Sequence, residues 1–401
     1  PHALMILVAA LSMADGRLYE AADALGASKL RVFFTVTLPG AKYGVISAGF
    51  VIFTLVVTDF GIAKVIGGRF NVLATDIFKQ VIGQQNFEMG AVVGFVLLIP
   101  AVVAFAANRI TERKQVALLS ARAVPHEPKP APLRDGLLFG FCAVVGGLIL
   151  GVLAMSVWAS LVTRWPYNLA LTLKNYAFSE FDSSGWSAYW NSLEMAAWTA
   201  AIGTVVVFLG AWLLEKTRGF AWGRGVAQFM AMLPMAVPGL VLGLAYIFFF
   251  NARGNPLGGL YATMAILVIN SVTHFYTVSH LTATTALKQL DSEFESVSAS
   301  LKVSLFRTMA RVTVPVCLPA VLDVSIYLFV NAMTTVSAVI FLYSTETKPA
   351  AVTIVNMDEA GFTAAAAAMA VCIVATSAAV KIVHLMLTRR IERTTQAWRK
   401  R

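Results

Sequence analysis

The side chains that could carry out chemistry in this chain are few and scattered. Its three cysteines, Cys142, Cys317 and Cys372, stand far apart inside apolar runs, without the spacing of metal ligands. His274 has no carboxylate near it in the sequence, and no Ser/His/Asp, Cys/His or paired-carboxylate pattern stands out. The phosphate-binding patterns GxxxxGKS and GxxxxGKT do not occur, so we do not expect this chain to bind ATP in the P-loop manner. We therefore predict no catalytic residue and no cofactor or metal site.

A second set of polar residues lies within apolar runs, where burial is costly unless the side chains face a bundle interior or a pathway. Thr58 and Asp59 precede Thr334 and Thr335 by a constant offset, since 334 − 58 = 276 and 335 − 59 = 276. That alignment would place polar groups from two related halves at one level, as a midplane site requires. Thr and Asn side chains can also hold helices together through interhelical hydrogen bonds, and this alternative stays open. The candidate pathway residues are Thr58, Asp59, Asn270, Asn331, Thr334 and Thr335.

The composition is typical of a polytopic membrane protein. Of the 401 residues, 58% are hydrophobic and 13% are charged, whereas soluble domains have about a quarter of their residues charged. The mean hydropathy is +0.74. The net charge of +10 does not indicate a nucleic-acid partner, because the basic residues gather beside apolar runs, as the positive-inside rule expects. The residues that we place in the cytoplasm on this basis are Arg109, Arg113, Lys114, Arg122, Lys129, Arg134, Arg389, Arg390, Arg393, Arg399, Lys400 and Arg401.

A membrane-spanning helix needs roughly 20 mostly apolar residues, and on this basis the sequence predicts an all-α protein with several spans. We expect residues 1–108 to form the C-terminal part of a first half, with its upstream spans missing, and 136–388 a second half of six spans. Residues 109–135 are a predicted cytoplasmic linker, and 389–401 a basic cytoplasmic tail. The predicted spans are 1–14 (the end of a span), 43–58, 89–108, 136–162, 195–214, 225–252, 260–287, 324–345 and 360–380.

Some of these spans carry features with two interpretations. Pro234, Pro238 and Gly239 interrupt the span 225–252, which favours a kinked, pore-lining helix or a passive kink relieved by neighbouring helices. If upstream spans are missing, small residues of the first half should lie exposed without a partner: Gly44, Ser47, Ala48, Gly90 and Gly94. Aromatic residues flank the outer ends of spans, as in an aromatic belt, with a role in receiving a binding protein as the alternative: Trp165, Tyr167, Tyr189 and Trp190.

A short polar stretch, residues 15–39, lies between two apolar runs. Asp15 predicts a helix N-cap, and Gly26 predicts a left-handed residue where that helix stops. Ser28 can cap a second short helix, and Pro39 ends the unit or opens the next helix. We expect a two-helix elbow with a narrow face for a partner to grip, formed by Leu18, Ala21, Ala22 and Leu25.

The same elbow occurs again at residues 291–315, since 291 − 15 = 276 and 315 − 39 = 276. A repeat of this kind indicates two halves of similar design. The apolar face carries over as Phe294, Val297, Ser298 and Leu301. The identical pairs at this offset are Asp15/Asp291, Leu25/Leu301, Ser28/Ser304, Arg31/Arg307, Val36/Val312, Thr37/Thr313 and Pro39/Pro315.

The spacing Glu20-Ala21-Ala22, three residues, Gly26, eleven residues, Leu38-Pro39 resembles the EAA loop of the membrane subunits of ABC importers. The second copy departs from this pattern: Ser296, Val297 and Ser298 replace Glu-Ala-Ala, and Lys302 replaces the glycine, while Pro315 is kept. The chain looks like a fused permease of the type that includes iron(III), thiamine and 2-aminoethylphosphonate importers. Residues 71–90 resemble the 2-aminoethylphosphonate group in particular.

The resemblance implies a multi-pass permease of the bacterial inner membrane that forms the pathway for a small solute. Its implied partners are a dimer of ATP-binding cassette subunits, gripping the elbows, and a periplasmic solute-binding protein, with membrane lipid around the spans. The implied coupling residues are those of the two motif copies. ATP hydrolysis would then belong to a separate subunit. A secondary transporter is the more remote alternative, and it should place ionisable residues at mid-membrane, where this sequence has few acids.

Overall fold

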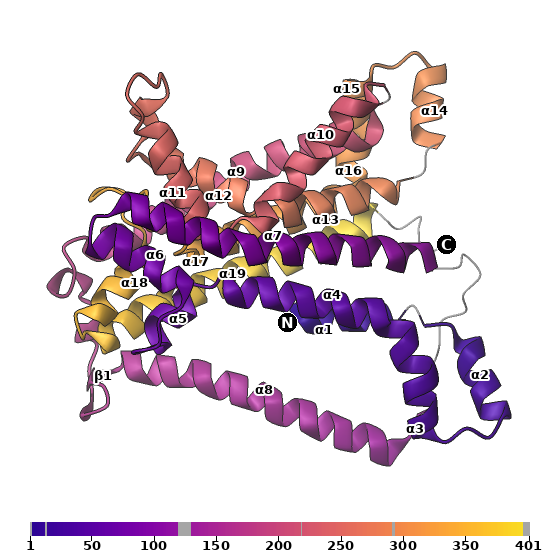
Figure 1. The fold of residues 1–401 in the computed structure, drawn as a ribbon, viewed down its shortest axis with the longest axis horizontal. Coiled ribbons are helices and arrows are strands. Elements are labelled where there is room, and N and C mark those ends of the chain that lie inside the picture. The colour runs from indigo at the N-terminus through magenta and orange to yellow at the C-terminus, as the bar shows by residue number, and fades with distance from the viewer. Residues whose placement is uncertain (1, 13, 119–129, 218, 291–292, 396–401) are drawn as a thin grey trace. The chain divides into compact units, whose positions relative to one another are not determined.

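The computed structural model describes residues 2–12, 14–118, 130–217, 219–290 and 293–395, and most of them are helical (Figure 1). By its internal contacts the chain divides into two units, Pro1–Asp59 with Asn71–Val152 and Phe60–Phe70 with Leu153–Arg401. Six residues used in the sequence analysis lie outside the described residues: Arg122, Lys129, Asp291, Arg399, Lys400 and Arg401.

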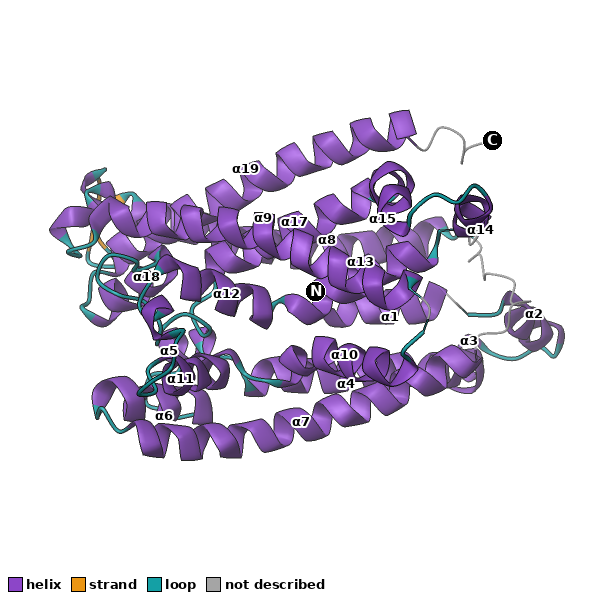
Figure 2. Ribbon diagram, turned by 90° about the horizontal axis from the view of Figure 1, so that it is seen from above, coloured by secondary structure: helices purple, strands orange, loops and turns teal. Residues whose placement is uncertain are grey.

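The first unit is built around α4 (Leu38–Val57), which packs against α1 (His2–Ser12) and runs beside α7 (Phe87–Leu118) (Figure 2). A Cβ atom at Gly44 would lie 2.3 Å from the Cβ of Ala10, so α1 and α4 approach closely because position 44 has no side chain. The expectation of exposed, unpartnered small residues is therefore wrong: Gly44, Ser47, Ala48, Gly90 and Gly94 are all buried. The shorter helices are α2 (Gly16–Ala24), α3 (Lys29–Val32) and α6 (Leu73–Phe78).

Helix α8 (Pro132–Ser160) is divided between the two units at Val152 and is exposed along its apolar length. The second unit continues with a small antiparallel pair, β1 (Val162–Arg164) and β2 (Asn168–Leu171), in which Val162 is opposite Leu171. Its helices are α5 (Gly61–Ile66), α9 (Gly185–Lys216), α10 (Ala221–Met232), α11 (Gly239–Phe250), α12 (Met264–His274), α13 (Tyr276–Lys288), α14 (Glu293–Ser300), α15 (Leu305–Thr308), α16 (Val314–Val316), α17 (Leu318–Thr334), α18 (Ala350–Glu359) and α19 (Thr363–Thr395).

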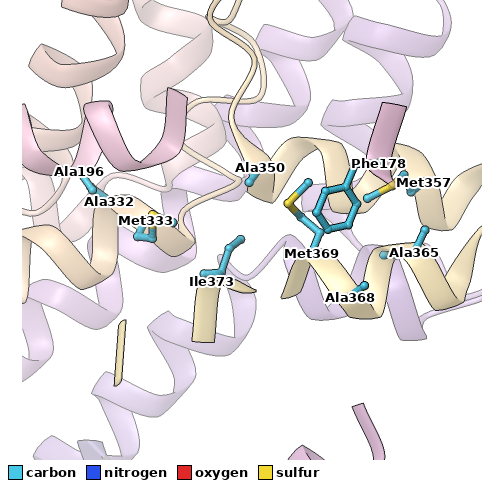
Figure 3. Packing of buried hydrophobic residues seen from close by; sticks show 11 residues of the cluster. Phe178, Ala196, Ala332, Met333, Ala350, Met357, Ala365, Ala368, Met369 and Ile373 are labelled. Carbon is cyan, nitrogen blue, oxygen red and sulfur yellow. The ribbon is translucent and has the colours of Figure 1, made fainter. Parts of the chain in front are cut away.

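An apolar cluster holds α9, α17, α18 and α19 together (Figure 3). Phe178, from the segment before α9, is fully buried and lies beside Met357 of α18 and Met369 of α19. Alanines fill most of the remaining cluster positions, so the helices approach closely, as is usual where membrane helices pack. A second cluster joins α9, α13 and α17 and includes Phe208, Leu287 and Leu328.

Among the described residues, five helices are long and apolar enough to cross a membrane, or up to seven if each of two bent pairs counts as one span. These helices confirm the all-α, multi-spanning prediction. Helix α7 extends to Leu118, which is 118 − 108 = 10 residues into the predicted linker.

The predicted span 225–252 is broken rather than kinked, because the helical stretch Ala221–Ala236, which contains α10, meets α11 at 114°. Val237 and Pro238 are both extended, with ψ of 118° and 141°. Proline lacks the amide hydrogen and disfavours a helical conformation in the residue before it, so one helix ends here and the next begins at Gly239.

Two other predicted spans are not continuous helices. The run 260–287 is divided at Phe275 into α12 and α13. In the predicted span 324–345, the helix ends at Thr334. The irregular segment that follows is buried, with Ala338 and Val339 at 0% exposure. Asn270 Nδ2 donates to the Ala338 carbonyl oxygen at 2.7 Å. Non-helical backbone is tolerated inside a membrane protein where protein buries it in this way.

Candidate functional site

The first elbow forms as its sequence predicts. The Asp15 side chain accepts a hydrogen bond from the Arg17 amide and caps α2, and Ser28 accepts one from the Arg31 amide and caps α3. Gly26 has φ of +67°, the left-handed conformation that stops α2. Tyr19 Oη donates to Thr37 Oγ1 at 3.1 Å and ties α2 to the segment after α3. The caps and the stop of this elbow thus follow from local signals in the sequence, and the Tyr19–Thr37 bond adds a longer contact.

The second elbow has the same backbone although it lacks most of the motif. Lys302 takes the place of Gly26 and has φ of +55°. The Ala27 amide bonds to the Ala22 carbonyl at 3.0 Å, and at the 276 offset the Val303 amide bonds to the Ser298 carbonyl at 2.9 Å. Both bonds span five residues, the pattern that closes a helix around a left-handed residue. The elbow geometry therefore does not depend on Glu-Ala-Ala or on glycine.

The correspondence continues beyond the elbows. Each second helix widens into a five-residue π turn, Phe33–Thr37 in the first copy and Met309–Thr313 in the second, and 309 − 33 = 276. Leu38 and Val314 then begin the next helices, with Pro39 and Pro315 in their first turns. Further along, α7 begins at Phe87 and α19 at Thr363, again 276 residues apart.

Both elbows present apolar side chains to their surroundings. In the first, Leu18 and Leu25 are 56% and 85% exposed, and Glu20 and Ala21 are exposed as well. Ala22 is buried, so only part of the predicted small-residue face points outward. In the second elbow, Val297 and Leu301 are 56% and 70% exposed. They line a groove of 640 Å³ with two basic residues, Arg307 and Arg311.

The candidate pathway residues bond mostly to nearby backbone. Thr58 Oγ1 donates to the Thr54 carbonyl at 2.8 Å, and Thr334 Oγ1 donates to the Val330 carbonyl at 3.0 Å. Asn331 Nδ2 bonds to the Tyr327 carbonyl, whereas Asn270 joins two separate segments, as helix-holding polar residues do. Thr335 is buried, and Asp59 belongs to the first unit with Thr58. Because the six residues are divided between the two units, their convergence stays a prediction.

The sequence analysis did not identify a buried ion pair between the segment before α9 and the segment before α18. Lys348 Nζ lies 2.6 Å from Asp182 Oδ2, and both side chains are 10% exposed. Burial alone would raise the pKa of Asp182, but hydrogen bonds from Lys348 and from the Ser184 amide hold the pKa below its usual value. No local pattern links two residues that are 166 positions apart.

A family model described as "Binding-protein-dependent transport system inner membrane component" matches residues 1–116 and 206–393. The chain belongs to this family. Among curated proteins, it is similar to a Haemophilus influenzae protein that bears the name of a ferric transport system permease, with 30% identity over 87% of this chain. It is also similar to the ferric transport system permease protein of Actinobacillus pleuropneumoniae, with 28% identity over 90% of this chain. It spans about half the length of these relatives, 55% and 53% respectively.

Among solved structures, the chain is similar to a bacterial ABC transporter involved in the import of the acidic polysaccharide alginate. The TM-score is 0.54 at 12% identity, covering 64% of this chain and 96% of that one. A second structure of an alginate ABC transporter, in complex with a periplasmic protein that binds an alginate pentasaccharide, gives the same TM-score. At this identity the likeness shows the fold alone.

Proposed function

We propose that this chain is a multi-pass permease subunit of a bacterial ABC importer and contributes the solute pathway through the inner membrane. The observation that carries the proposal is the pair of elbows, which repeat the same capped, left-handed backbone at an offset of 276 residues. Family membership and the several apolar helices support it.

The proposed partner of both elbows is a dimer of ATP-binding cassette subunits, which hydrolyses the ATP that this chain has no P-loop to bind. The exposed apolar side chains of each elbow, Leu25 and Leu301 among them, would be covered by a groove in that partner. A periplasmic solute-binding protein is the proposed partner on the outer side, in keeping with the description of the family.

The proposed solute is iron(III), delivered as cargo by the binding protein. Both relatives compared above bear the names of ferric transport permeases, and their similarity extends over most of this chain. The 2-aminoethylphosphonate prediction rests on residues 71–90 alone and stays a prediction. Thiamine has no further support beyond the general resemblance.

The proposed pathway combines polar groups from both halves at one level. Thr58 and Asp59 would contribute these groups from the first half, and Thr334 and Thr335 from the second, with Asn331 on the same helix as Thr334. Asn270 would instead hold the buried segment at Ala338 in place. Replacing Asn270 should then impair folding, whereas replacing Asp59 with Asn should reduce uptake without lowering the amount of protein in the membrane.

The test is ATP hydrolysis in proteoliposomes that contain the permease, its ATP-binding cassette subunits and its binding protein. We expect the iron(III)-loaded binding protein to stimulate hydrolysis several-fold, and 2-aminoethylphosphonate to have no effect. Stimulation by 2-aminoethylphosphonate alone would replace the proposed cargo and leave the importer class intact. Hydrolysis that responds to neither solute, together with no binding of the cassette subunits, would overturn the proposal.

A further inference from the structure

The segment between α8 and α9 presents a row of apolar side chains to its surroundings. Tyr167 is 86% exposed, and Leu169, Leu171 and Leu173 are 50%, 73% and 73% exposed. Leu169 and Leu171 are two apart on strand β2, so their side chains leave the strand on the same face. Soluble surfaces seldom leave such a run of large apolar side chains uncovered.

Hydrogen bonds hold this hairpin on the end of α8. Asn175, which is buried, donates from Nδ2 to the carbonyl oxygens of Ser160 and Val162 at 2.9 and 2.6 Å. Tyr176 Oη lies 2.9 Å from Ser160 Oγ, and the Thr172 amide donates to the Leu161 carbonyl at 2.7 Å. The hairpin is therefore fixed directly after the last turn of α8, and its leucines are held outward rather than folded against the helix.

Helix α8 indicates what surrounds the hairpin. Its 29 residues have an apolar window of mean hydropathy 2.6, of which 0% is buried. A helix of this length and composition, exposed on all sides, is suited to lipid. The hairpin begins two residues after α8 ends, which is the depth at which a spanning helix leaves the hydrocarbon. Aromatic residues with a polar tip, such as Tyr167, prefer this boundary.

The charges of the hairpin complement lipid headgroups. Arg164 and Lys174 lie at its two ends and are exposed, and residues 161–179 contain no Asp or Glu. Basic side chains beside an apolar surface are the arrangement that anionic membranes attract.

We propose that the hairpin of residues 162–174 is an interfacial anchor, which inserts Tyr167, Leu169, Leu171 and Leu173 into the outer leaflet while Arg164 and Lys174 contact lipid phosphates. Side chains of this type enter the headgroup–acyl boundary by about 5–10 Å. Lipid is thus the partner of this surface, and it positions the outer end of α8 at a fixed depth.

The test is the accessibility of spin labels on the chain reconstituted in nanodiscs of phosphatidylcholine with phosphatidylglycerol. Single cysteines are placed at Leu169→Cys and Leu171→Cys, with Ala170→Cys as the matched neighbour on the opposite face of the strand. The background carries Cys142→Ala, Cys317→Ala and Cys372→Ala. Leu148→Cys, 68% exposed in mid-α8, reports the lipid value, and Glu180→Cys reports the water value.

We expect labels at positions 169 and 171 to collide with dissolved oxygen more often than with a water-soluble nickel chelate, as at 148, and the label at 170 to show the smaller ratio. The ratio of oxygen to nickel collisions at 169 and 171 should differ between discs that contain phosphatidylglycerol and discs of pure phosphatidylcholine. Replacing Arg164 and Lys174 with Gln should remove that difference. Nickel collision at 169 and 171 equal to that at 180 would overturn the proposal and leave the hairpin in water. Shielding from both reagents would also overturn it, and would indicate a protein partner such as a binding protein or a second copy.

Discussion

The first elbow keeps Glu20, Ala21 and Gly26, whereas the second has Ser296, Val297 and Lys302 at the same offsets. Their backbones nevertheless agree at the left-handed residue, at the hydrogen bond that closes the first helix and at the π turn beyond it. A left-handed conformation costs a side-chain-bearing residue about 1–2 kcal/mol relative to a helical one. The second elbow keeps its shape despite that cost, so shape rather than residue identity is the shared feature of the two elbows.

The two copies diverge immediately after the π turn. In the first, α4 continues through position 43, which is Tyr, to Val57. In the second, α16 stops at Val316 and α17 leaves at an angle of 77°, with Pro319 at the position equivalent to Tyr43, since 319 − 43 = 276. The second half thus has a bent helix where the first half has an unbroken one, and Pro319 lies in the first turn after the bend.

The largest expected effect comes from transferring that proline. Tyr43→Pro removes one backbone hydrogen bond inside α4 and places the ring against the carbonyl of residue 39, at a cost of about 3 kcal/mol or more. We expect a correspondingly lower midpoint of denaturant unfolding in detergent. Tyr43→Phe is the matched control and should unfold within about 0.5 kcal/mol of the unaltered chain. An unchanged midpoint for Tyr43→Pro would show that α4 is already bent there.

The two halves also differ at the buried ion pair, because position 72, which is equivalent to 348, is Val rather than Lys. Lys348→Met would leave Asp182 buried without its partner, which costs about 3 kcal/mol. Adding Asp182→Asn should restore most of that loss. The pair is intact only while Asp182 is ionised, and its pKa in the folded protein is lowered. Its contribution to the free energy of unfolding should therefore be constant from pH 7 to pH 5.

That contribution should disappear as the pH falls below about 4, the ordinary pKa of Asp, and through the lower value in the folded chain. The measurement is the unfolding free energy of the unaltered chain minus that of the double variant at each pH. A difference that grows on acidification would contradict the lowered pKa.

A smaller effect is expected at the left-handed position of the first elbow. Gly26→Val forces a β-branched residue to φ of +67° and stores about 1–3 kcal/mol of strain. No atom would clash with an added Cβ, so the effect is conformational. We expect ATP hydrolysis to continue while transport falls, with normal insertion in the membrane. Gly26→Asn is the matched control, because Asn adopts the left-handed conformation more readily and should retain transport.

The smallest effect is expected at the equivalent position of the second elbow. Lys302→Gly relieves the strain at φ of +55° and should raise the free energy of unfolding by about 0.5–1 kcal/mol, with transport unchanged. The comparison of the two elbows would be wrong if Lys302→Gly abolished transport while Gly26→Val had no effect.

Much of the architecture was accessible from the sequence because its signals are local. Caps at Asp15 and Ser28, the stop at Gly26 and the long apolar runs of α4, α7, α8, α9 and α19 each depend on neighbouring residues. The ends of other spans were not accessible, since an apolar run does not reveal that residues after Thr334 fold as a buried irregular segment. That outcome depends on Asn270, far away in the sequence, which bonds to Ala338. The conformation of Lys302 could have been anticipated from the repeat offset, but not from lysine itself.

The measurement that tests the account most directly is cross-linking of both elbows to the ATP-binding cassette subunits. Ala21→Cys and Val297→Cys occupy equivalent, exposed positions, since 297 − 21 = 276, and each would carry a benzophenone label in the assembled complex. Ser183→Cys, between the predicted spans 136–162 and 195–214 and away from both elbows, is the control. If shape defines the docking surface, both elbows should cross-link to the cassette subunits in comparable yield, and position 183 should not. Cross-linking at Ala21→Cys alone would show that the motif residues, rather than the shared backbone, are what the partner recognises.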